Sequence, residues 1–278
     1  MYHSFHFSGR SSRAPDRTGP YTRLVTASVV AVANQKGGVG KTTTTHSLGE
    51  AMAAAGRHVL LVDLDPQACL TYAAGLDPEN LECSLHDVLT GRSNAADAVT
   101  KAGRCSMVPA SIDLAGSEIA LANRVGREHA LARAIAPIRD DFDVVLVDCP
   151  PSLGILTING LTAADAVVIP LQCETLSHRG VGQLLETIAD VRAYAKPDLA
   201  VLGAIATMFD ARSRHPREIA ADVAQRYDLR VFEPAVPRSI RFAEAPASGA
   251  SILDFAPTSR GAAAYRELAR QVVESLVA

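Results

Sequence analysis

The chain has 278 residues, of which 48% are hydrophobic and 21% charged, and its formal net charge is −3. This length suffices for one sizeable core, and the small negative charge excludes binding of nucleic acid through overall basicity, although not through a local basic patch. Five scattered cysteines without Cys-x-x-Cys spacing favour free thiols in a reducing cytoplasm over a disulfide framework or a zinc site. No apolar run approaches the roughly 20 residues of a membrane-spanning helix, so we expect a cytoplasmic protein.

The first 24 residues differ in composition from the rest. They are rich in Ser, Arg, His and Pro, show no hydrophobic period and lack the apolar centre of a signal peptide. Residues 1–24 are therefore predicted to be a disordered basic tail. Residues 25–278 contain no linker and are predicted to be one domain.

The clearest motif is a glycine-rich segment, residues 34–42, that follows an apolar run over 29–33 and precedes a helix predicted from about 43 to 55. In this context a loop binds phosphate, because its N–H groups and the helix N-terminus face the anion. Lys41 is expected on the β- and γ-phosphates of a nucleotide, and the Thr42 hydroxyl on Mg²⁺. The predicted nucleotide-binding residues of this segment are Gly37, Gly38, Val39, Gly40, Lys41, Thr42 and Thr43.

Acidic residues follow two later apolar runs. Residues 59–62 form a predicted buried strand that ends in Asp63 and Asp65, and residues 142–147 form another that ends in Asp148, as in a Walker B motif. Continuous apolar runs are typical of parallel strands covered on both faces, and ligands bind beyond the carboxyl ends of such strands. We therefore expect these acids to converge with the glycine-rich loop. Asp148 is expected either to accept a hydrogen bond from a water bound to Mg²⁺ or to bind the metal directly.

The remaining pattern alternates helices and strands. Gly160, inside a predicted helix over 156–162, marks close packing, and Cys149 is expected to be a buried structural thiol. Other helices are predicted over 84–89, 114–124, 128–135, 177–194, 216–227 and 262–277. Other strands are predicted at 166–171, 199–208 and 230–232, and residues 107–110 are predicted to be the end of a strand.

Five blocks in this order resemble the ParA/Soj partition ATPases, a group with a deviant Walker A motif in the ParA/MinD family; the stretch 68–121 is similar to an actinobacterial Soj-like group. Gln35 replaces the first glycine of the general P-loop, and Lys36 precedes the glycine pair. The blocks are residues 35–42, 62–67, 148–154, 169–174 and 237–246.

The resemblance implies a P-loop NTPase with an α/β fold, in which a doubly wound, mostly parallel sheet carries helices on both faces. It also implies that ATP and Mg²⁺ drive a homodimer in which Lys36 acts in trans on the partner's phosphates. Asp65 matches the residue that positions the attacking water, and Asp63 the support of the Mg²⁺ shell. Lys36, Lys41 and Asp65 are thus the predicted catalytic residues, with slow hydrolysis until a ParB-like partner completes the site.

Relatives bind double-stranded DNA without sequence preference through arginines in the segments 208–217 and 237–241, which implies a nucleoid-associated protein. Seven arginines lie between 212 and 241, and phosphate binding by such a group is sensitive to salt and blind to sequence. The predicted DNA-binding residues are Arg212, Arg214, Arg238 and Arg241. Asp210 and Pro237 are predicted to contact adenine, from the family layout alone. The cargo, whether chromosome, plasmid or protein assembly, stays open.

Two other functions and one departure remain. A MinD-like membrane-cycling ATPase needs a basic amphipathic C-terminal helix, whereas residues 263–278 contain Glu267 and Glu274 and few anchors, so we prefer core packing and expect no membrane partner. Iron-sulfur carrier relatives need paired cysteines, and no cysteine here has that context. Relatives usually have Gly-Asn after Asp-Pro-Gln, where this chain has Ala68 and Cys69.

Overall fold

The computed structural model describes residues 27–174 and 177–277, so the predicted basic tail, residues 1–24, lies outside the described residues. The strands are β1 Ser28–Val32, β2 Val59–Asp63, β3 Thr100–Ala102, β4 Cys105–Val108, β5 Val144–Asp148, β6 Ala166–Gln172, β7 Ala200–Thr207 and β8 Val231–Phe232. The helices are α1 Lys41–Ala54, α2 Cys69–Ala73, α3 Leu85–Thr90, α4 Ala95–Ala98, α5 Leu114–Ala122, α6 Ala130–Arg139, α7 Ile155–Ala163, α8 Ser177–Tyr194, α9 His215–Tyr227, α10 Arg241–Glu244, α11 Ile252–Phe255 and α12 Arg260–Val277.

The strands form one sheet in the order β3-β4-β2-β5-β1-β6-β7-β8, and only the pairing of β3 with β4 is antiparallel. The parallel register sets Val32 and Asp63 level with Asp148, so that the carboxyl ends of β1, β2 and β5 meet at one edge of the sheet. The predicted convergence of the acidic strand ends with the glycine-rich loop is thereby confirmed.

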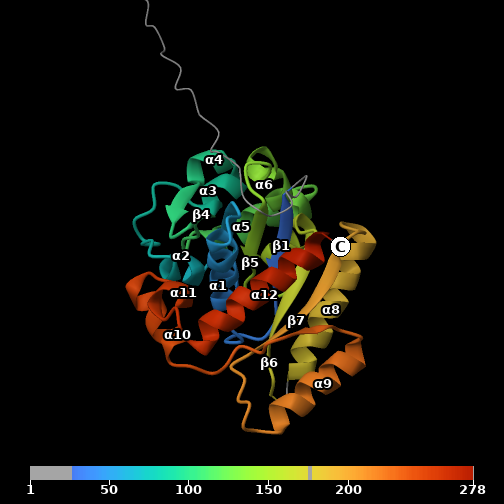
Figure 1. Ribbon diagram of the computed structural model, residues 1–278. Helices are drawn as coiled ribbons and strands as arrows, with labels where there is room; N and C mark the ends of the chain where they lie inside the picture. Colours follow the sequence, from blue (N-terminus) through green and yellow to red (C-terminus); the bar gives the residue numbers. More distant parts are fainter. Residues whose placement is uncertain (1–26, 175–176, 278) are drawn as a thin grey trace, which may run out of the picture.

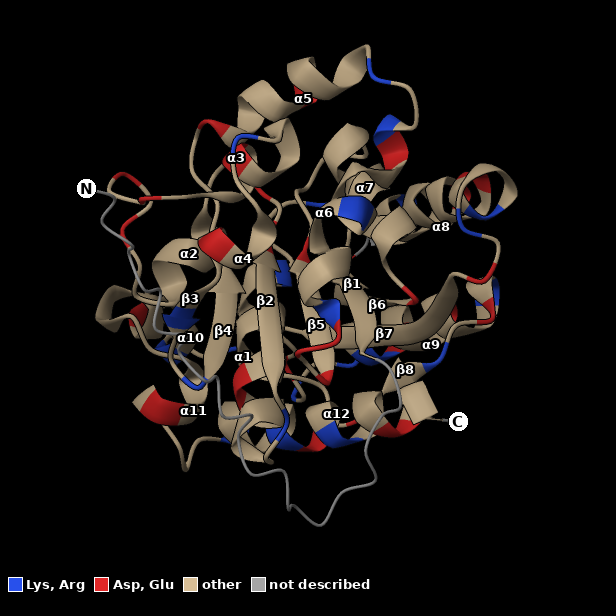
Figure 2. Cartoon of the chain, turned by 90° about the horizontal axis from the view of Figure 1, so that it is seen from above, with Lys and Arg blue, Asp and Glu red and all other residues tan. Residues whose placement is uncertain are grey.

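Both faces of the sheet are covered, as predicted. Val29 and Ala31 of β1 point into a core formed with α3 to α8 and part of α9, whereas Val30 points to the opposite face, where α1, α2, α11 and α12 pack. Figure 1 shows α12 lying across this second face beside α1. Figure 2 shows the charged residues mainly on helices and loops, with the strands largely tan. Burial on both faces explains why the strands read as continuous apolar runs.

The closing helix α12 packs in the core, as expected. Tyr265 is among the largest fully buried side chains, and its hydroxyl lies 3.0 Å from that of Thr44 on α1. Leu268 and Val272 continue the same buried stripe. Among the described residues, no helix is long and apolar enough to cross a membrane.

Gly160 confirms the close packing predicted for its helix. A Cβ at this position of α7 would lie 2.7 Å from Cys149 Sγ and 3.1 Å from Leu64 Cδ2. Cys149 is itself 1% exposed, and burial raises the pKa of its thiol, which fits the predicted structural role.

Several short elements were not predicted from the sequence. They are α2, α4, β3, α10 and α11, each of five residues or fewer. Elements this short are stabilised by tertiary packing rather than by propensity, so no periodicity marks them.

Candidate functional site

The glycine-rich loop joins β1 to α1 and has the backbone that its sequence requires. Gly38 and Gly40 have φ of 74° and 85°, a left-handed conformation that glycine adopts without a steric penalty. Nothing lies within 4 Å of the position where a Cβ of Gly37 or Gly38 would stand. The loop therefore presents open backbone in front of the α1 N-terminus, where the helix dipole favours an anion.

Lys41 begins α1 and turns back over the loop. Its Nζ donates to the Lys36 carbonyl at 3.1 Å, and the side chain is largely buried. Burial lowers the pKa of Lys41, while the nearby charge of Asp148 opposes that shift. An ammonium group that is held at low solvent exposure interacts strongly with a phosphate, because little water screens it.

Asp148 lies behind this loop at the end of β5. Its Oδ1 is 3.2 Å from the Thr45 hydroxyl, and the Thr42 hydroxyl also hydrogen-bonds the carboxyl group. Burial, and then the charge of Asp63, raise the pKa of Asp148. Its second oxygen, Oδ2, is buried and has no hydrogen-bond partner among the described residues. A buried unpartnered carboxylate oxygen beside a threonine hydroxyl is the donor set that Mg²⁺ and its bound waters require.

Asp63 is fully buried at the end of β2, the strand next to β5, and its carboxyl group accepts hydrogen bonds from α2. It accepts from the Thr71 N–H at 2.8 Å and the Thr71 hydroxyl at 2.7 Å, and from the Asp65 N–H at 3.2 Å. Burial raises the pKa of Asp63. The carboxyl group thus fixes the turn that carries Asp65, and Asp65 in turn accepts from the Gln67 N–H at 2.9 Å.

The same turn contains the departure from the usual Gly-Asn pair. Ala68 is buried and has φ of 51°, a left-handed conformation that costs a residue with a Cβ roughly 1–2 kcal/mol. The glycine usual in relatives is the residue that avoids this cost.

Lys36 lies at the outer side of the loop. Its Nζ is 2.8 Å from Glu174 Oε2, just beyond the end of β6, and its side chain is 33% exposed. Asn34 joins the same two segments, since it accepts from the Lys36 N–H at 3.0 Å and donates to the Pro170 carbonyl at 2.7 Å.

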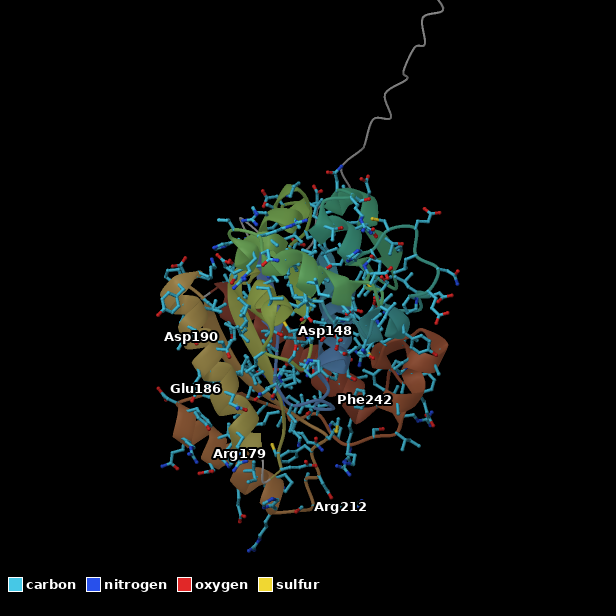
Figure 3. All side chains as sticks on the ribbon, turned by 180° about the vertical axis from the view of Figure 1, so that it is seen from behind. Asp148, Arg179, Glu186, Asp190, Arg212 and Phe242 are labelled. Atoms are coloured by element: carbon cyan, nitrogen blue, oxygen red, sulfur yellow. The ribbon has the colours of Figure 1, made fainter. Side chains whose placement is uncertain are left out.

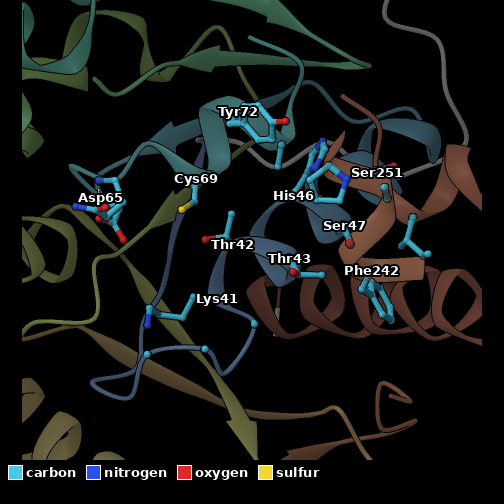
Figure 4. Close-up of a pocket in the computed structure, with 18 of the residues that line it drawn as sticks. Lys41, Thr42, Thr43, His46, Ser47, Asp65, Cys69, Tyr72, Phe242 and Ser251 are labelled. Carbon is cyan, nitrogen blue, oxygen red and sulfur yellow. Dashed lines mark hydrogen bonds between the residues drawn. The ribbon is translucent and has the colours of Figure 1, made fainter. Parts of the chain in front are cut away.

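A pocket of about 650 Å³ opens in front of the loop. Figure 4 shows Lys41 and Asp65 toward one side of the pocket and Phe242 at the other, with Thr43 between. Its lining includes Met208, which has a left-handed φ of 50°. Asp210 and Pro237, predicted to contact adenine, are not among the lining residues.

Asp210 and Pro237 lie near each other where β7 ends. Pro237 forms a bridge with Phe209, and Asp210 Oδ1 accepts from the Arg212 N–H at 3.0 Å. Just before them, the Thr207 hydroxyl donates to the Val39 carbonyl at 2.7 Å, which ties the glycine-rich loop to β7.

The four arginines predicted to bind DNA are all exposed. No carboxylate of the described residues lies within 4.0 Å of Arg212, Arg214 or Arg238, whereas Arg241 pairs with Glu244 at 3.7 Å. Figure 3 places Arg179 of α8 and Arg212 toward the same end of the molecule, with Glu186 and Asp190 farther along α8.

Several residues of this region were not predicted from the sequence to belong to the site. Thr45 carries a usable signal, because it stands one helical turn after Lys41 and so returns to the face of α1 toward the sheet. Thr71, Met208 and Phe242 carry none, because only the fold brings them to the site.

Known proteins share this architecture. The AAA domain family matches residues 27–201. The sporulation initiation inhibitor protein Soj of Bacillus subtilis is 41% identical over 246 residues, which cover 88% of this chain and 97% of Soj. The chromosome partitioning protein ParA of Caulobacter vibrioides is 42% identical over 249 residues, which cover 88% and 93%. A crystal structure described as cobyrinic acid a,c-diamide synthase from Mycobacterium smegmatis, with bound ADP and magnesium, is 50% identical with a TM-score of 0.82, covering 91% and 96%. The chain therefore belongs to the ParA/Soj family of P-loop ATPases.

Proposed function

We propose that this chain is a partition ATPase that dimerises around Mg²⁺ and ATP and then holds DNA without sequence preference. The observation that carries the proposal is the unpartnered Asp148 Oδ2 behind an open phosphate loop that bears Lys41 and Thr42. This combination provides both a cation and an oxygen-rich metal position for a nucleoside triphosphate.

In the proposed nucleotide site, residues at or after the ends of β1, β2 and β5 have different roles. Mg²⁺ and ATP together supply a phosphoryl group that can pass to water. Thr42 and Asp148 hold the metal's ligand shell, and Lys41 and the backbone N–H groups at 37–43 bind phosphate. Asp65 orients the attacking water, and Asp63 keeps the turn of Asp65 in place through the bond between them.

In the proposed dimer, Lys36 of each copy binds the phosphates held by the other copy. Two triphosphates facing each other concentrate negative charge in one closed interface, and buried charge is costly unless it is paired. A lysine that crosses from each copy provides that pairing. Lys36 suits this role because it lies on the outer side of the loop and is one-third exposed.

The arginines supply the DNA step. Arg212 and Arg214 are exposed and lack close carboxylate partners among the described residues, so phosphates can compete for them directly. Arg238 is also exposed, and its charge acts on Glu174 without an ion pair within 4.0 Å. Dimerisation doubles this surface and makes retention on DNA depend on ATP. A ParB-like partner that stimulates hydrolysis would then release the dimer.

Sedimentation of the wild-type and Lys36→Ala proteins, each with and without Mg²⁺ and ATP, tests the dimer. We expect a dimer only for the wild type with nucleotide. Filter binding of random-sequence duplex DNA under the same conditions tests retention. A wild-type chain that stays monomeric with ATP, or binds DNA equally without it, would overturn the proposal.

The description of the M. smegmatis structure favours a second candidate, an ATP-dependent amide-forming enzyme acting on cobyrinic acid. Incubation with cobyrinic acid, ATP, Mg²⁺ and either glutamine or ammonia tests it. Mass spectrometry would then show a loss of about 1 Da for each carboxyl group converted to an amide. We prefer partition because Soj and ParA are 41% and 42% identical to this chain over 88% of its length.

Membrane cycling and iron-sulfur transfer lack support in the described residues. The apolar face of α12 is buried against α1 and is not presented to a lipid surface. Iron-sulfur carriers need paired cysteines that meet across a dimer axis, whereas Cys105, Cys149 and Cys173 are buried in this chain.

A further inference from the structure

We propose that Glu174 stores Lys36 in the monomer, so that dimerisation must first break the ion pair between them. This inference rests on the proposed function, because it assumes that Lys36 crosses to a partner's phosphates. It adds a positioning residue that acts through Lys36 and opposes the dimer.

The geometry of the pair is well defined. Lys36 Nζ donates to Glu174 Oε2 at 2.8 Å, and the other oxygen of Glu174 accepts from Gln172 Nε2 at 2.6 Å. Both carboxylate oxygens thus accept a hydrogen bond, and the charge of Arg238 also acts on this carboxyl group. The bond to Lys36 is the first cause of the lowered pKa of Glu174, so the carboxyl group is charged at neutral pH.

The backbone around the pair is also held. Asn34 bonds the Lys36 N–H and the Pro170 carbonyl, which fixes the loop against β6 four residues before Glu174. A Cβ at Gly180 of α8 would lie 3.1 Å from Asn34 Oδ1 and 3.6 Å from Lys36 Cβ, so α8 packs closely against the loop. The backbone and Cβ of Lys36 are therefore held in place, at a position from which its side chain reaches Glu174.

The two partners of Lys36 exclude each other. An ammonium group that reaches the phosphates of a second copy cannot keep a 2.8 Å contact to its own Glu174. Because the side chains are 33% and 51% exposed, solvent screens the pair and its stabilisation is small. The contact thus raises the concentration at which dimers form without preventing them.

Glu174→Gln tests the inference, since it removes the charge while retaining an oxygen for Gln172. The dimer dissociation constant is measured by sedimentation with Mg²⁺ and a non-hydrolysable ATP analogue. We expect tightening of roughly two- to tenfold, because a dimer breaks two such exposed pairs. Structural damage would weaken the dimer, so the sign of the change separates the two explanations.

Three matched variants complete the experiment. Glu174→Asp, which keeps the charge, should stay close to wild type. Glu186→Gln removes an exposed carboxylate of α8 that forms no ion pair with Lys36, and should change nothing. In a Lys36→Ala background, Glu174→Gln should not restore dimerisation.

The outcomes separate this inference from the proposed function. If the wild type never dimerises with nucleotide, the proposed function fails. If the wild type dimerises and Lys36→Ala does not, but Glu174→Gln dimerises equally or more weakly, the storage role of Glu174 is wrong and the proposed function stands.

Discussion

The nucleotide end of the sheet and the arginine-bearing segment 210–241 are built on opposite principles. At the nucleotide end, three adjacent parallel strands bring Lys41, Asp63 and Asp148 together in a buried cluster, in which Thr45 hydrogen-bonds Asp148 and Thr71 hydrogen-bonds Asp63. In the segment 210–241 the predicted DNA-binding arginines are exposed, and among the described residues only Arg241 has an ion-pair partner within 4.0 Å, although the charge of Arg238 also acts on Glu174. The first region achieves specificity by fixed geometry, whereas the second offers charge that any phosphate backbone can use.

The largest expected effect comes from removing the buried cation. Lys41→Ala should lower the hydrolysis rate by at least about 10²-fold, because a preorganised charge in a water-poor site cannot be replaced by solvent. Calorimetric titration with ATP and a steady-state phosphate assay measure binding and turnover. Lys101→Ala, which removes an exposed lysine on β3, is the control. Unchanged turnover in Lys41→Ala would show that this region does not act through fixed charge.

An added methyl group in the buried core beside the nucleotide end should lower the stability of the fold. Gly160→Ala is expected to lower the free energy of unfolding by about 1–3 kcal/mol, because its methyl group would press on Cys149 directly after Asp148. Urea denaturation measures the change. The matched control is Gly116→Ala in α5, where the new methyl group meets only His86 at 3.6 Å and should be neutral or stabilising. Equal unfolding midpoints for the two variants would contradict this packing argument.

Each exposed arginine is expected to contribute a small and similar amount to the DNA affinity. Arg212→Ala, Arg214→Ala and Arg238→Ala are each expected to weaken DNA binding several-fold. Each should also reduce the slope of log K against log salt concentration by about 1 for every DNA phosphate that is no longer bound. Titration at a series of KCl concentrations measures both quantities, with Arg266→Ala on α12 as the control. A weakening that depends on DNA sequence would instead indicate base readout.

The smallest effect concerns the paired arginine. Because Glu244 lies 3.7 Å from Arg241, Glu244→Gln should strengthen DNA binding by about twofold, the scale of one exposed ion pair. The same titration detects it, and the gain should vanish in an Arg241→Ala background. Weaker binding in Glu244→Gln would show that Glu244 positions Arg241 rather than competing for it.

The residues that follow predicted strands could be placed from the sequence, whereas contacts between distant segments could not. The loop at 34–42 and the acids at 63 and 148 follow strands whose apolar runs are legible, so their convergence follows from parallel topology alone. Contacts between distant segments could not be predicted, because only the packing of the fold brings Thr71 of α2, Glu174 after β6 and Phe242 of α10 to this region. The short helix α2 was missed for the same reason, although Ala68 and its left-handed backbone stand at its start.

The bond between Thr207 and the Val39 carbonyl has a mechanical consequence. Thr207 is the last residue of β7, and five residues later the chain reaches Arg212. Any movement of the loop backbone at Val39 must either break this bond or pull the end of β7 along with it. This hydrogen bond therefore links the backbone of the phosphate loop to the strand after which the arginine-bearing segment 210–241 begins.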